Sequence, residues 1–188
     1  LYKVKGFEIP ESRRDAKGQH IANVLQLEPG EKVEKMLAIS NFDQASFLVL
    51  ATKKGKVKKT ALSNYANGRK RGLIAISLTP GDELIGAGLC NEEDDLIFIS
   101  EKGMSIRFSA DNEQLRPLGR QAAGVQAMKL KEGDEIFQSF ETTNKTDIIF
   151  LTNSGQAYKA KLHEFDDTKA SVLGDYIPAK LGMDAGEN

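Results

Sequence analysis

The chain has 188 residues, 40% of them hydrophobic and 28% charged, and a formal net charge of −1. This length allows one or two domains with a real core. No apolar run approaches the roughly 20 residues of a membrane span, and the first residues do not show a signal-peptide pattern. A single cysteine, Cys90, excludes an intramolecular disulfide framework and is typical of a reducing compartment. Because the chain opens at Leu1 in a strand-like pattern, we expect it to be a piece of a longer protein.

An internal repeat of about 51 residues runs along the chain. Three segments end in the same Gly-acid turn: ANVLQLEPGEKV (22–33), LIAISLTPGDEL (73–84) and VQAMKLKEGDEI (125–136). A degenerate fourth copy begins at Tyr176. A second set of turns, at Gly55, Gly103 and Gly155, keeps nearly the same period. Two independent landmarks with one period indicate a true repeat.

Each unit consists of strand signals. In the third unit these are the apolar run 96–100, the alternating segment 105–109, and the segments 125–130 and 135–140, with a polar loop over 110–124. Four strands per unit and turn glycines predict an all-β, propeller-like array of blades that stack to form a core. The expected units are residues 1–56, 57–104, 105–156 and a truncated 157–188, all within one domain.

Basic residues gather in one stretch and recur in equivalent loops. Residues 53–71 hold eight Lys or Arg and no acidic residue, which is the usual footprint of a polyanion-binding face, although such runs are also often plain solvated surface. The loops 7–21, 63–73 and 110–125 each carry cations close to a glycine, and loops of stacked blades emerge along one rim. Tyr65 is the one aromatic residue in the most basic loop, which favours a duplex held by its phosphates over a stacked single strand. The cations that we predict to contact phosphates are Arg13, Arg14, Lys17, Lys54, Lys56, Lys58, Lys59, Arg69, Lys70, Arg71, Arg107, Arg116, Arg120 and Lys159.

Several of these motifs carry a resemblance to a known family. The succession VKGFEIPESRRDAKG, ATKKGKVKKTALSNY, GLIAISLTPGDELIG, SIRFS and RPLGRQAAGVQAMKLKEGDEI resembles the C-terminal domain of DNA gyrase A, part of a bacterial type II topoisomerase. The resemblance covers nearly the whole chain and weakens after about Lys161. It implies a six-bladed β-pinwheel whose blades exchange strands, with this chain corresponding to the second to fourth blades and the start of the fifth. It also implies that a basic perimeter wraps double-stranded DNA with positive handedness, so that strand passage introduces negative supercoils.

The resemblance further implies the partners. These are the N-terminal domain of gyrase A, together with gyrase B, in an A2B2 holoenzyme that acts in the bacterial cytoplasm on the nucleoid, without membrane contact. ATP and Mg²⁺ are then held elsewhere in the enzyme, and this chain holds no cofactor. The family's basic box, Gln-Arg-Arg-Gly-Gly-(Lys or Arg)-Gly, is not present; residues 12–18 and 68–72 occupy comparable loops without matching it. The paralogous topoisomerase IV domain, which lacks the box, therefore remains an alternative.

The sequence offers no catalytic constellation. His20 and His163 have no Cys partners at metal-ligand spacing, and there is no phosphate-binding Gly-Lys-Ser/Thr loop and no nucleophile elbow. Tyr2 and Tyr158 occupy equivalent repeat positions in a strand, which indicates a structural role. We expect a non-catalytic module, with a protein-binding propeller as the alternative from another functional class.

Overall fold

β-Strands make up nearly all the regular structure of the chain. The computed structural model describes residues 1–42, 46–67 and 72–184. Its strands are β1 (Phe47–Thr52), β2 (Lys56–Ala61), β3 (Leu84–Cys90), β4 (Asp95–Ser100), β5 (Met104–Ser109), β6 (Val125–Gln126), β7 (Ile136–Thr142), β8 (Asp147–Leu151), β9 (Ala157–Lys161) and β10 (Asp175–Tyr176). The helices are short: 3₁₀ turns η1 (Gly6–Glu8), η2 (Ile21–Asn23), η3 (Leu62–Tyr65) and η4 (Leu162–Glu164), and one α-helix, α1 (Ile177–Leu181). The predicted all-β class is confirmed.

Three antiparallel hairpins repeat along the chain: β1–β2, β4–β5 and β8–β9. Their turns contain the predicted glycines Gly55, Gly103 and Gly155, at φ of 80°, 75° and 83°. Residues with a side chain rarely adopt this left-handed region, so glycine is the residue that such tight turns require. The apolar first strand and the short turn together explain why these segments form hairpins.

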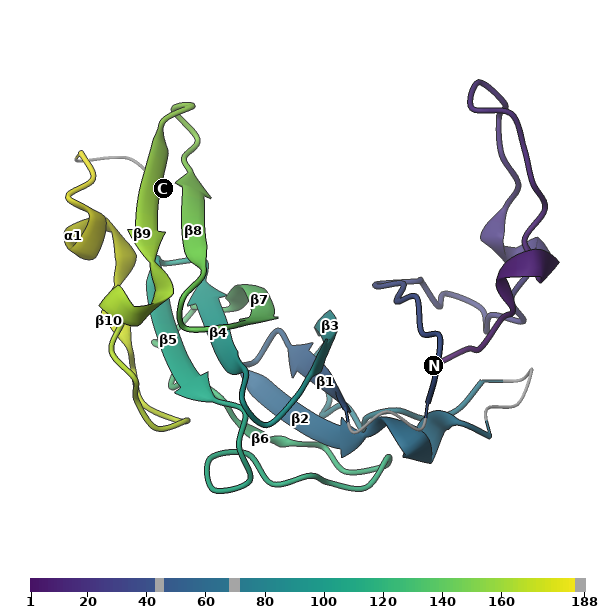
Figure 1. Ribbon diagram of the computed structural model, residues 1–188, viewed down its shortest axis with the longest axis horizontal. Helices are drawn as coiled ribbons and strands as arrows, with labels where there is room; N and C mark the ends of the chain where they lie inside the picture. Colours follow the sequence, from purple (N-terminus) through teal and green to yellow (C-terminus); the bar gives the residue numbers. More distant parts are fainter. Residues whose placement is uncertain (43–45, 68–71, 185–188) are drawn as a thin grey trace.

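Neighbouring units exchange strands. Sheet 1 has the order β3-β1-β2-β6, and sheet 2 has the order β10-β5-β4-β7. In both cases the last strand to join, β6 or β10, lies beyond the next hairpin in the sequence, so each sheet is completed by the unit that follows it. Sheets therefore do not coincide with consecutive 51-residue segments. The sheets and the β8–β9 hairpin follow one another along an open arc (Figure 1).

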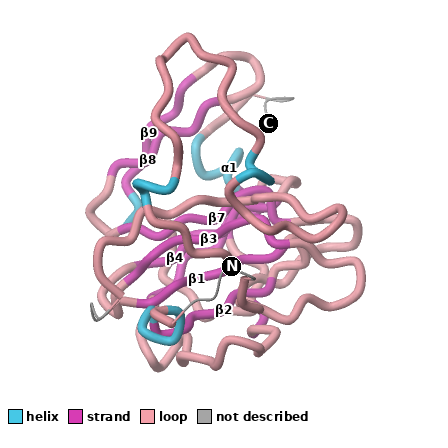
Figure 2. Tube along the Cα trace, turned by 90° about the vertical axis from the view of Figure 1, so that its right-hand side faces the viewer, coloured by secondary structure: helices cyan, strands magenta, loops and turns pink. Residues whose placement is uncertain are grey.

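The main core lies between sheets 1 and 2. Val49 and Ala51 of β1 pack with Phe98 of β4 and Phe108 of β5, whose rings stack at a centroid distance of 5.7 Å. Strands β3 and β7 run next to each other (Figure 2). Two smaller clusters join sheet 2 to the β8–β9 hairpin, around Ile97 and around Phe165.

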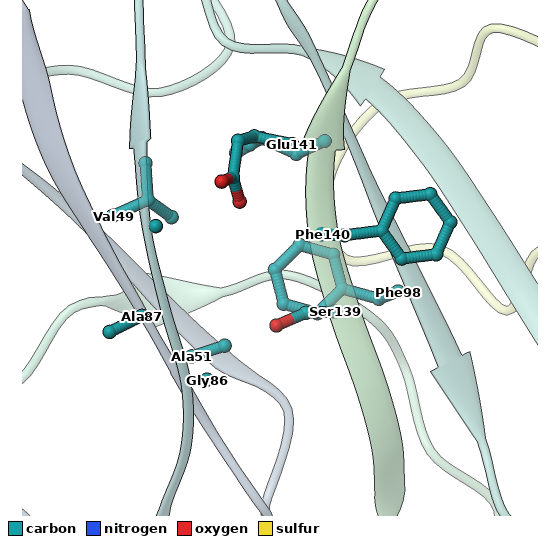
Figure 3. Close-up of a pocket in the computed structure, with 10 residues that line it drawn as sticks. Val49, Ala51, Gly86, Ala87, Phe98, Ser139, Phe140 and Glu141 are labelled. Atoms are coloured by element: carbon teal, nitrogen blue, oxygen red, sulfur yellow. The ribbon is translucent and has the colours of Figure 1, made fainter. Parts of the chain in front are cut away.

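The β3–β7 contact is close because β3 carries glycines. A Cβ at Gly86 would collide with the Ser139 hydroxyl, and one at Gly88 would collide with the Glu141 carboxylate. These side chains, together with Phe98, line a cavity of ≈ 10 Å³ (Figure 3). That volume is room for about one water molecule, so the cavity cannot hold a substrate.

The first unit differs from the prediction. Residues 1–40 extend from the sheets at the end of the arc opposite β8 and β9 (Figure 1). Described residues 1–42 form two 3₁₀ turns and no strand, although the segments 1–5 and 22–33 read as strands. Leu1 and Leu73 exchange two backbone hydrogen bonds, of 2.7 and 2.8 Å, but one such exchange does not make a ladder. None of the helices in the described part of the chain has the length and hydropathy that a membrane crossing needs.

Candidate nucleic-acid interface

Two equivalent loops lie along the outer edges of the two sheets. Loop 110–124 runs alongside β2 in space, and its Leu118 amide donates to the Lys59 carbonyl at 2.7 Å. Loop 165–174 runs alongside β5 in the same way, and its Thr168 amide donates to the Arg107 carbonyl at 3.0 Å. We call them the perimeter loops. Because β6 and β10 directly follow them, strand exchange itself carries each perimeter loop onto the preceding sheet.

The perimeter loops also touch the segments that precede the Gly-acid turns. The Ser77 amide and hydroxyl donate to Ala122 and Gln121 of the first loop, at 3.3 and 2.6 Å. One unit later, the Lys129 amide donates to Val172 of the second loop at 2.8 Å. A continuous edge results, in which each loop is bonded to its neighbours along the arc. Cations on these loops therefore lie along one connected edge.

The structure exposes part of the predicted cations. Arg116 is exposed and Arg120 half-buried on the first perimeter loop. Arg13, Arg14 and Lys17 are exposed on the extended first unit, where Arg13 pairs with Asp15 at 3.4 Å. The remaining exposed or half-buried members lie on the hairpins and are Lys54, Lys56 and Lys159. For all these cations a phosphate contact stays a prediction.

Two hairpin cations are already engaged within the chain. Lys54 lies at the β1–β2 turn, and its ammonium donates to the Pro80 carbonyl at 2.7 Å. Lys159 pairs with Asp147 across the β8–β9 hairpin at 2.8 Å, with 64% of its side chain exposed. The exposed Lys159–Asp147 ion pair contributes little free energy, so Lys159 can still turn toward a phosphate.

Lys58 and Lys59 lie inside the fold, with relative exposures of 0%. The Lys58 ammonium donates to the carbonyls of Ala75 and Arg120, and the Lys59 ammonium to the carbonyl of Ala110. Burial lowers the pKa of Lys58 to about 8, and the nearby Arg120 adds to the shift. The charged ends of both lysines are thus bound to carbonyls beneath the surface, and a phosphate contact by either stays a prediction.

Arg107 is also buried, at 8% exposure. Its guanidinium pairs with Asp95 at 2.8 Å and donates to the Phe165 carbonyl at 3.0 Å. It therefore joins β4, β5 and the start of the second perimeter loop, and its phosphate contact stays a prediction. Arg69, Lys70 and Arg71 lie outside the described residues.

Two further exposed lysines lie on the same edge and were not among the predicted cations. Lys169 lies on the second perimeter loop, and Lys129 lies on the segment bonded to it. Lys169 precedes Gly174 by five residues, as Arg120 precedes Gly124 by four, so the spacing to the loop glycine could have identified it. Asp166 and Asp167 are exposed on the same loop, which makes this part of the edge less positive than the first perimeter loop.

The Gly-acid turns have a role that sequence reasoning left open. Asp82 and Asp134 are 7% exposed, and each accepts hydrogen bonds from the preceding hairpin turn. They hold the turns rather than a ligand. Among the described residues no group of His, Cys, Asp and Glu has the arrangement of a metal site.

Comparison with known proteins agrees with this architecture. The family model described as "DNA gyrase C-terminal domain, beta-propeller" matches residues 1–40, 46–91, 94–140 and 146–171. The A subunit of DNA gyrase from Mycolicibacterium smegmatis is 42% identical over 88% of this chain, and that from Streptomyces coelicolor is 42% identical over 99%. The chain spans only about a fifth of these relatives, 20% and 22% of their lengths.

Two solved structures share the fold. The C-terminal domain of a DNA topoisomerase IV aligns with a TM-score of 0.79 and 31% identity over 91% of this chain and 53% of that one. A DNA gyrase A C-terminal domain aligns with a TM-score of 0.73 over 86% and 53%, at 22% identity, which shows the fold alone. With the family model matching most of its residues, the chain belongs to the family of DNA gyrase C-terminal β-propeller domains.

Proposed function

We propose that this chain binds double-stranded DNA along its perimeter loops, mainly through phosphate contacts, and bends it around the arc of sheets. The observation that carries the proposal is that equivalent loops of successive units lie on one continuous edge and expose Arg116, Lys129 and Lys169. Tyr65 of the most basic stretch is fully buried, so it offers no ring on which a single-stranded base could stack. Both features favour a duplex as the ligand.

Within a whole gyrase, this binding would serve strand passage. We propose that the chain is part of a gyrase A, that it works with the N-terminal part of gyrase A and with gyrase B in an A2B2 enzyme, and that ATP and Mg²⁺ act on those other parts. By wrapping DNA with positive handedness it would let the enzyme introduce negative supercoils in the bacterial cytoplasm. The two gyrase A relatives, each 42% identical to this chain, support this assignment. The chain matches about a fifth of each, so the rest of such a subunit would supply the other parts.

The binding test uses duplexes of rising length and unrelated sequence. We expect affinity to rise with length beyond one contact site, to change little with sequence, and to fall with salt by about 0.9 in log K per log salt for each phosphate contact. The variant Arg116→Ala/Lys129→Ala/Lys169→Ala should flatten the salt dependence. Lys145→Ala, on the turn between β7 and β8, removes one exposed charge away from the perimeter loops and serves as the comparison. Binding that ignores length and salt would contradict the proposal and favour a protein-binding module.

A topoisomerase IV domain is the second candidate, because that structure aligns with the higher TM-score and identity of the two. Ligation of nicked circles in the presence of the chain separates the two. A positively handed wrap leaves a positive linking difference after protein removal. Binding and bending without such a wrap leave the linking number unchanged, which would favour the topoisomerase IV assignment.

A further inference from the structure

Adjacent lysines of β2 hold opposite ends of the first perimeter loop. Lys59 donates from its ammonium to the Ala110 carbonyl and, at 3.1 Å, to the Asn112 side-chain oxygen, both at the start of loop 110–124. Lys58 donates to the Arg120 carbonyl near the end of the loop and to the Ala75 carbonyl on the neighbouring segment. Between them the Leu118 amide is bonded to β2. The loop is therefore attached to sheet 1 at three points, with Arg116 between the attachments.

Comparison of equivalent repeat positions indicates that a perimeter loop lying on the sheet buries the cation at the Lys59 position. The Lys59 position, four residues after the turn glycine, is Arg107 in sheet 2 and Lys159 in the β8–β9 hairpin. Arg107 donates to the Phe165 carbonyl at the start of the second perimeter loop, and it is buried like Lys59. No described loop crosses Lys159, and 64% of its side chain is exposed. One sequence position is thus buried where a following loop lies on it and exposed where none does.

Each cation also contacts the first residue of its own hairpin. Lys59 lies 4.5 Å from the centroid of the Phe47 ring, and Arg107 and Lys159 pair with Asp95 and Asp147 at 2.8 Å. These contacts hold each cation against its own hairpin. An ammonium has several donors and can bind carbonyls of two segments at once, which an apolar side chain of the same length cannot do. Burial of a charge is costly without such partners, so loop and lysine depend on each other.

We propose that Lys58 and Lys59 are positioning residues for DNA: they fix loop 110–124 on sheet 1 so that Arg116 and Arg120 are presented to the phosphates, and they do not contact phosphate themselves. This inference rests on the proposed function. It assigns to two of the most basic-looking positions of the chain a role beneath the interface.

A double-mutant cycle on the 188-residue chain tests the coupling. Lys58→Met and Arg116→Ala/Arg120→Ala are each expected to weaken duplex binding and to flatten the salt slope, by about 0.9 per lost phosphate contact. In the combined variant, Lys58→Met should cause almost no further loss. Additive losses of affinity and slope would show a separate phosphate contact by Lys58 and overturn the proposal. It also fails if the folded Lys58→Met variant, or the Arg116→Ala/Arg120→Ala variant, binds like the unchanged chain.

Lys145→Met provides the matched control for loss of one lysine charge, and its effect should simply add to that of the arginine pair. Because Lys58→Met removes a buried donor, Asn112→Ala gives a milder second route, since it takes one acceptor from Lys59 at the surface. We expect faster hydrogen exchange at the Leu118 amide and a smaller loss of affinity in the same direction. Unchanged exchange and unchanged affinity would overturn the inference for Lys59.

The two proposals fail in distinguishable ways. If the unchanged chain shows no salt-dependent binding to duplex, the proposed function fails, and the inference about DNA presentation falls with it. If the unchanged chain binds and the cycle is additive, the function stands and only the positioning role is lost. Exchange at Leu118 reports in either case whether the lysines hold the loop.

Discussion

Asp134 accepts a 2.7 Å hydrogen bond from the Ser100 hydroxyl, and both residues are buried. Its other carboxylate oxygen accepts from the amides of Lys102 and Glu135, each at 3.0 Å. One unit earlier, Asp82 accepts from the Thr52 hydroxyl at 2.8 Å and from the Lys54 amide at 2.9 Å. The acids of these two Gly-acid turns, Asp82 and Asp134, thus each hold the hairpin turn of their own sheet.

Replacing Asp134 by Ala should lower the free energy of unfolding by about 2–3 kcal/mol, because it leaves the Ser100 hydroxyl and two amides without their acceptor. Urea unfolding measures this loss. Glu132→Ala, on the exposed part of the same turn, should stay within about 0.5 kcal/mol of the unchanged chain. Equal effects of the two changes would contradict a fastening role for Asp134.

Gly174→Ala should destabilise the chain more than Gly155→Ala. Both glycines have positive φ, at 80° and 83°, so each change costs about 1–2 kcal/mol of backbone strain. A Cβ at Gly174 would also collide with the Ser105 carbonyl where β10 joins sheet 2, whereas one at Gly155 meets open space. Thermal unfolding of the two variants tests the ranking. Equal unfolding midpoints would contradict the prediction, because they would mean that β10 shifts to make room for the new Cβ at no cost in stability.

Arg107→Met should cost about 3–5 kcal/mol, because it leaves the Asp95 carboxylate buried without its partner. The double variant Arg107→Met/Asp95→Leu should regain most of that loss, since apolar side chains can replace a buried ion pair. Urea unfolding of the two variants measures both changes. A double variant as unstable as Arg107→Met alone would contradict the role of the Arg107–Asp95 pair.

The stability contribution of Lys58 should rise with pH. Its pKa is lowered to about 8 from the ordinary value of 10.5, so the folded chain loses this proton first. Between about pH 8 and 10.5 the unfolded chain binds more protons at this site, and the linkage relation then requires stability to increase with pH. Cys90 acts in the opposite sense, because burial raises the pKa of its thiol to about 12. The unfolding free energies of the unchanged chain and of Lys58→Met are compared across pH, so that the Cys90 contribution cancels in their difference. This difference should grow from about pH 7.5 to about 9.5. A constant difference would contradict the prediction.

The sequence predicted those parts of the fold that depend on local chemistry. Turns at Gly55 and Gly103 need left-handed backbone, the run 96–100 is apolar, and the segment 105–109 alternates, so the sequence predicted these hairpins. Strand exchange could not follow from the repeat alone, because a period gives the length of a unit and not the sheet that its last strand joins. The segment 125–130 was expected as one strand, yet only Val125–Gln126 pairs with β2.

The candidate site shows a similar division. Cations on polar loops, such as Arg116, are exposed as expected. Lys58 and Lys59 look equally available in the sequence, but their acceptors lie in loop residues more than 50 positions later or on a neighbouring segment. A charge with distant carbonyl partners cannot be told from a solvated one by composition. Only the crossing of the perimeter loop over β2 separates them.

Strand exchange also sets an order on folding during synthesis. Sheet 1 begins at Phe47 but receives its fourth strand from Val125–Gln126, and sheet 2 waits for Asp175–Tyr176. A ribosome that has released the first hairpin therefore holds an open β2 edge until the whole second hairpin has emerged. Each new unit supplies the last strand of the sheet before it, so the sheets are completed in order from the N-terminal side. The most recently made sheet keeps an unpaired strand edge until the next unit emerges. If synthesis stops between units, that edge can pair with other chains and aggregate.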